Sequence, residues 1–280
     1  MSIYEKKRVG VVMGGRIEIL KDVVYDTGLK HYRDISINKG TRSVFDVSNT
    51  WAGGAGDIDQ GAIIKDLTFN NYEGSFNKAK KFKNGGMIFT GVGNDGFDFE
   101  QRSIMSSQDK HWMMTVWLKI TSAGAVNSFN NQTLHFATTG LNDGNQSLLS
   151  LVPTTNASGN VTTVELRVRG KNYVVTSQVM PLYDGNVHQL SVECSVSQDG
   201  ATQRVIIFID KVKVYDSGNS AVATALPGEP TVRRVGTSAS LPLAWGGSFY
   251  RARVDDLAVS GLLAEEVITA DYESAHARFS

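Results

Sequence analysis

The chain has 280 residues, of which 41% are hydrophobic and 20% are charged, and its 28 Lys and Arg residues balance its 28 Asp and Glu residues. This composition excludes disordered, collagen-like and coiled-coil proteins, and the balanced charge gives no reason to expect nucleic-acid binding. A single cysteine, Cys194, excludes an internal disulfide framework.

The N-terminal segment, residues 1–50, contains several short apolar runs but no long alternating strand. Its apolar stretch at residues 9–15 is rich in glycine and lacks a cleavage site, so we expect synthesis in a cytoplasm without a signal peptide. The same stretch lacks the G-x-G-x-x-G spacing of nucleotide-binding loops, and no run is long enough to cross a membrane. We interpret residues 1–50 as an extended assembly arm and residues 51–61, with four glycines, as a flexible joint.

Period-two segments dominate residues 62–280, which we interpret as one folded domain. Residues 112–120, 164–169 and 187–196 alternate between apolar and polar positions, as strands with one buried face do. Residues 205–209 are apolar on both faces and predict a central strand, followed by a hairpin partner at residues 211–215. The expected inward-facing set is Val116, Leu118, Leu166, Val168, Leu190, Val192, Ile207, Ile209 and Val254.

One helix is predicted near the end of the chain, at residues 262–273. Leu263, Val267, Ala270 and Ser274 form its expected apolar stripe, and acidic residues occupy its first turn, where they suit the helix dipole. The sequence therefore predicts an all-β protein. Its expected architecture is a two-sheet antiparallel jelly-roll sandwich with an extended N-terminal arm and one short C-terminal helix.

Five sequence blocks in order resemble those of laminin G-like and concanavalin A-like jelly-roll domains. The blocks lie at residues 64–82, 114–119, 184–190, 207–211 and 253–267. The chain departs from the pattern at Val187, where Trp is usual, and at Lys211, where Gly is usual. The resemblance implies a sandwich over about residues 62–280, but not one function, because this fold serves lectins, adhesion modules, glycan hydrolases and structural proteins.

Catalysis is not expected. Hydrolases that resemble this domain carry a Glu-x-Asp-x-x-Glu strand, and this chain has no such string. The nearest acidic group is Asp95, Asp98 and Glu100, which we interpret as a turn followed by a solvated strand. We expect His188 to pack inside the protein, and Cys194, on an apolar strand face, to be an inert core thiol.

Two binding functions stay open. A basic patch of Lys78, Lys80, Lys81 and Lys83 could hold an anionic polymer, although a solvated basic strand is the commoner arrangement. Trp112, Phe129 or Trp245 could stack on sugars, although aromatic residues more often belong to the core.

The resemblance also implies a structural Ca²⁺ site at the rim of the sandwich. Asp255 or Asp256 matches the acidic block of the family, and Asp66 or Asp57 could complete the oxygen ligands that Ca²⁺ needs. Ion pairing of Asp255 with Arg251 and Arg253 is the alternative.

We expect the chain to be a non-enzymatic structural component of a phage particle, in a decoration or adsorption role, and therefore located in the virion. Its expected partners are other virion proteins or identical subunits, bound through residues 1–50, with no nucleic acid and no membrane insertion. The alternative is a glycan-binding lectin module for attachment to host surfaces, and a glycan hydrolase is a third interpretation.

Overall fold

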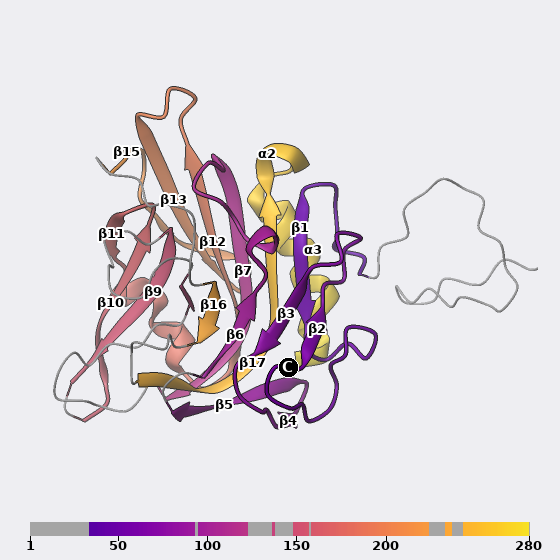
Figure 1. The fold of residues 1–280 in the computed structure, drawn as a ribbon. Helices are drawn as coiled ribbons and strands as arrows, with labels where there is room; N and C mark the ends of the chain where they lie inside the picture. The colour runs from indigo at the N-terminus through magenta and orange to yellow at the C-terminus, as the bar shows by residue number, and fades with distance from the viewer. Residues whose placement is uncertain are drawn as a thin grey trace, which may run out of the picture.

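The computed structural model describes residues 34–92, 95–122, 136–137, 148–156, 158–223, 233–236 and 243–279. Within these residues, antiparallel strands form one sheet of nine strands and one of eight, which pack face to face. Figure 1 shows the sheets as two layers, with β7 and β17 in one and β3, β6, β9 and β10 in the other. The predicted all-β sandwich is confirmed.

The nine-stranded sheet is ordered β14-β13-β12-β7-β17-β5-β4, with β1 beside β17 and β15 beside β13. Its strands are β1 (Thr41–Asp46), β4 (Phe82–Lys83), β5 (Gly86–Val92), β7 (His111–Ser122), β12 (Val187–Val196), β13 (Thr202–Ile209), β14 (Val212–Asp216), β15 (Ser220–Ala221) and β17 (Leu243–Asp256).

The eight-stranded sheet is ordered β11-β10-β9-β8-β16-β6-β3-β2. Its strands are β2 (Ile63–Lys65), β3 (Glu73–Phe76), β6 (Gly96–Phe99), β8 (Phe136–Ala137), β9 (Leu149–Thr155), β10 (Val161–Val168), β11 (Lys171–Val174) and β16 (Arg234–Gly236).

The core between the sheets contains every residue of the predicted inward-facing set, all of them buried. This prediction is confirmed because side chains along a strand alternate between faces, so one buried face appears directly in the sequence. An aromatic cluster of Phe76, Phe89, Phe97 and Phe249 fills one part of this core, with ring centroids 4.9 to 6.2 Å apart.

Helix α3 (Ala264–Phe279) covers the outer face of the nine-stranded sheet, together with α2 (Leu257–Ser260). Residues Ile206 and Phe208 of β13 pack on these helices while Val205 and Ile207 face the other sheet, which confirms the predicted central strand. The remaining short helical segments are α1 (Thr176–Val179) and 3-10 turns at Gln101–Ser103 and Met180–Tyr183. In the described residues, no helix is long and apolar enough to span a membrane.

The predicted helical stripe is wrong at all but one position. Leu263 is exposed and precedes the helix, and Ala270 is also exposed. The buried positions are Ala264, Val267, Ile268, Asp271, Ala275 and Phe279. The sequence pattern missed these positions because Asp271 is one of them. Apolar residues at helical spacing do not reveal a charged residue that is buried through ion pairing.

Residues 34–50 belong to the sandwich, whereas we expected the assembly arm to extend to residue 50. Strand β1 pairs with β17 over Thr41–Asp46, and Val44, Phe45 and Val47 are fully buried. The expected joint also packs on the sandwich. Ala52 is fully buried, and Gly54 lies so close to Val47 that an added Cβ would overlap its carbonyl oxygen. The rest of the expected arm, residues 1–33, lies outside the described residues.

Candidate functional site

The outer face of the eight-stranded sheet carries a row of polar side chains. The strand register places Ser75 of β3 opposite Asp98 of β6, and Asp98 opposite Arg234 of β16. Their neighbours along the strands, Phe97 and Val235, point into the core, so the polar residues point outward. Helices α2 and α3 pack on the other sheet and do not cover this face.

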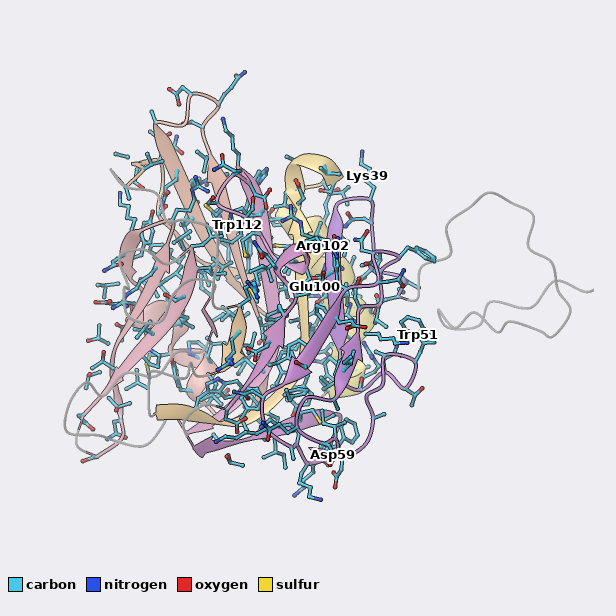
Figure 2. All side chains as sticks on the ribbon, in the orientation of Figure 1. Lys39, Trp51, Asp59, Glu100, Arg102 and Trp112 are labelled. Atoms are coloured by element: carbon cyan, nitrogen blue, oxygen red, sulfur yellow. The ribbon has the colours of Figure 1, made fainter. Side chains whose placement is uncertain are left out.

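Arginine–carboxylate pairs recur on this face. Arg102 donates to Glu100 through Nε at 3.0 Å and Nη2 at 2.9 Å, and Arg234 binds Asp98 through Nε at 2.5 Å and Nη2 at 2.8 Å. Figure 2 shows Glu100 and Arg102 next to each other, where β6 ends. In each pair, two hydrogen bonds hold the planar guanidinium and the carboxylate in a fixed orientation relative to each other.

The pair of Glu100 and Arg102 is the most accessible of these groups. The Arg102 side chain is 78% exposed, and its guanidinium carbon lies 5.9 Å from the ring centroid of the half-buried Tyr72. Glu100 also accepts from the backbone amide of Glu73 in the adjacent strand at 3.3 Å. A ring, a carboxylate and a guanidinium therefore lie together at the rim of the eight-stranded sheet. We call these residues, Tyr72, Glu100 and Arg102, the rim site.

Asp98 and Glu100 share the outer face, but Asp95 does not join them. Asp95 is fully buried and paired with Lys80. Asp98 accepts hydrogen bonds from Arg234, and Glu100 accepts them from Arg102.

The basic patch considered at Lys78, Lys80, Lys81 and Lys83 does not form one exposed group. Lys80 is buried beside Asp95, and the exposed Lys81 is paired with Asp57 at 2.5 Å. Among the aromatic residues considered for sugar stacking, Trp112 and Trp245 are both buried in the core, which is the alternative named for them. Phe129 lies outside the described residues.

The carboxylates considered for Ca²⁺ each have other partners. Asp255 accepts two hydrogen bonds from Arg253, at 2.6 and 2.8 Å, which is the ion pairing named as the alternative. Asp256 caps α2 by accepting from the amide of Val259, and Asp66 accepts from the amide of Val44. Burial raises the pKa of Asp66 despite its hydrogen bonds. Across the described residues, no three His, Cys, Asp or Glu side chains gather as metal ligands.

His188 and Cys194 have structural surroundings. The His188 ring is mostly buried, and its nitrogens bond Asp210 at 2.6 Å and Asp184 at 2.9 Å. The bond to Asp210 and, secondarily, that to Asp184 raise the pKa of His188 to about 9 against the effect of burial. Cys194 is a buried free thiol, and burial raises its pKa to about 12, so it stays protonated and inert as expected.

A buried charge network was not predicted from the sequence. Arg251 is fully buried and donates to Asp34 at 2.8 Å, Asp46 at 3.0 Å and Asp271 at 3.0 Å. Asp271 also accepts from Trp117 Nε1 at 2.8 Å. The network fastens residues 34–46 and α3 to β17. In the sequence, the network is visible only as charged residues at alternate positions of β17, and this pattern is typical of a solvated strand face.

No family model and no curated protein sequence matches this chain. Among solved structures, it is similar to Trypanosoma rangeli sialidase in complex with 2,3-difluorosialic acid, with 11% identity over 94% of this chain and a TM-score of 0.53. It is also similar to a T. rangeli sialidase mutant that displays trans-sialidase activity, with 11% identity over 86% of this chain and a TM-score of 0.51. The chain spans only 37% and 34% of the lengths of these two proteins. At this identity, the likeness establishes a shared β-sandwich fold.

Proposed function

We propose that this protein is a glycan-binding β-sandwich module that holds a saccharide on the outer face of its eight-stranded sheet. The observation that carries this proposal is the rim site, where Glu100 and Arg102 are paired and exposed beside Tyr72. Arg234 and Asp98 extend the same polar surface along the sheet.

The chemistry of these groups matches that of a saccharide. Neighbouring hydroxyl groups of a sugar donate and accept in pairs, and a carboxylate beside a guanidinium offers acceptors and donors in one plane. Mutual pairing holds both side chains in place, so binding immobilises less of the protein. The sialidase of similar fold binds a sialic acid derivative, and a saccharide ligand is consistent with that likeness.

Glycan-array binding of the full chain, followed by calorimetric titration of the strongest glycan, tests this proposal. Replacing Arg102 or Glu100 by alanine should weaken binding about tenfold or more, which corresponds to about 1.4 kcal/mol. Arg204→Ala is the matched control, because Arg204 forms a similar exposed pair with Asp216 on the other sheet. Absence of binding to any glycan, or equal losses in all three variants, would refute the proposal.

The proposed module binds without turnover, and it corresponds to the lectin alternative of the sequence interpretation. The role as a phage-particle component stays a prediction, because it depends on assembly through residues largely outside the described part of the chain.

A further inference from the structure

Lys80 and Asp95 form a buried pair at one end of the eight-stranded sheet. Lys80 follows β3 and Asp95 directly precedes β6, and the antiparallel pairing of these strands brings the two residues to the same end. Their side chains are 1% and 0% exposed, and Lys80 Nζ bonds Asp95 Oδ1. Water is therefore excluded from both reactive groups.

Apolar surroundings favour the uncharged form of the Lys80 amine. Lys80 Nζ lies 5.9 Å from the ring centroid of Phe76 and 5.2 Å from that of Phe89, within the aromatic cluster of the core. Burial lowers the pKa of the Lys80 amine, and the contact with Asp95 only partly offsets this effect. Transfer of one proton along the hydrogen bond gives a neutral amine, which is a nucleophile, beside a neutral carboxylic acid.

The second carboxyl oxygen of Asp95 has two hydrogen-bond donors of its own. Asp95 Oδ2 accepts from the backbone amide of Thr90 at 3.0 Å and from the Thr90 hydroxyl at 3.2 Å. If Nζ attacks the carboxyl carbon, negative charge develops on this oxygen, and donors already directed at it stabilise the tetrahedral intermediate. Nucleophile, electrophile and oxyanion donors are thus assembled in one buried site.

We propose that Lys80 and Asp95 condense to an intramolecular isopeptide bond. Lys80 Nζ bonds to the Asp95 carboxyl carbon, and the bond from that carbon to Oδ1 breaks. Two of the three protons of the original ammonium group leave with Oδ1 as water, and the third stays on the amide nitrogen. The reaction needs no oxidant and no other reactant. Its product is a covalent link between the segment after β3 and the start of β6.

Mass spectrometry of the denatured full chain tests this inference and does not require any variant to fold. The expected mass, after allowance for removal of Met1, is lower than that of the sequence by one water molecule. Tryptic digestion should yield a branched peptide in which Lys80, within residues 79–81, is joined to Asp95, within residues 84–102. A mass equal to that of the sequence, with normal tryptic cleavage after Lys80, would overturn the proposal.

A cyclic imide at Asp95–Gly96 would also remove one water, so two variants distinguish the reactions. In Lys80→Met the water loss should disappear, whereas a cyclic imide would leave it in place and contradict the cross-link. Lys81→Met is the matched control. The neighbouring Lys81 is exposed and paired with Asp57, so its replacement should leave the water loss and the branched linkage intact.

Discussion

Replacing Arg251 by methionine removes a guanidinium that contacts three buried carboxylates, those of Asp34, Asp46 and Asp271. Arg251 is fully buried, as is Asp46, while Asp271 is 1% and Asp34 9% exposed. Methionine fills a similar volume but donates no hydrogen bond, so the carboxylates lose their shared partner. Arg253 Nη1 stays 3.7 Å from Asp271, and Arg278 stays 2.8 Å from Asp46, so part of the charge remains compensated.

The expected loss of unfolding free energy is about 3–5 kcal/mol, the range for breaking a buried ion pair by removal of one partner. Because domains of this kind are stable by about 5–15 kcal/mol, such a loss is a large part of the total. The loss arises mainly from the unpaired charges, not from missing packing, since the side-chain volumes are similar.

Urea denaturation of the wild type and the variant measures this difference, with the slope of the transition as a check on two-state behaviour. Arg204→Met is the control, because the Arg204 side chain is 43% exposed and its pair with Asp216 contributes less than about 1 kcal/mol in such a setting. An Arg251→Met loss no larger than that of the control would refute the reasoning that this network fastens β1 and α3 to β17.

Three further outcomes follow from the structure. The pKa of His188 is about 9 in the fold against 6.5 ordinarily, so its stabilisation of the fold is complete below pH 6.5 and is lost as the pH rises to 9. In thermal melts over this pH range, the melting temperature of His188→Gln should therefore fall less than that of the wild type. Gly247→Ala should destabilise the protein by about 3 kcal/mol in urea titrations, because its φ is +148° and a Cβ would overlap the carbonyl oxygen of Lys119. Deletion of residues 1–48 removes β1 and should abolish cooperative unfolding; a cooperative melt at the temperature of the full chain would contradict the assignment of β1 to the core.

The sequence by itself determined several strands and their inward faces. Leu166 and Val168 in β10, and Leu190 and Val192 in β12, alternate with polar residues at the period of a strand. A short continuous apolar run at residues 205–209 identified β13 as a strand covered on both faces. Alternation is a property of neighbouring residues, so it does not depend on which strands pair.

Only the tertiary structure decided what covers each face and which charges meet. Thr41 bonds Asp255 across 214 positions of the chain, so nothing near β1 in the sequence announces its partner. Lys80 lies in a lysine-rich segment that is typical of the protein surface, but its side chain is buried because the fold places Asp95 beside it. Arg102, in contrast, has an exposed side chain because it follows the end of β6, and the sequence does not show where this strand ends. Ion pairing and burial are set by contacts between distant segments, and local periodicity carries no information about those contacts.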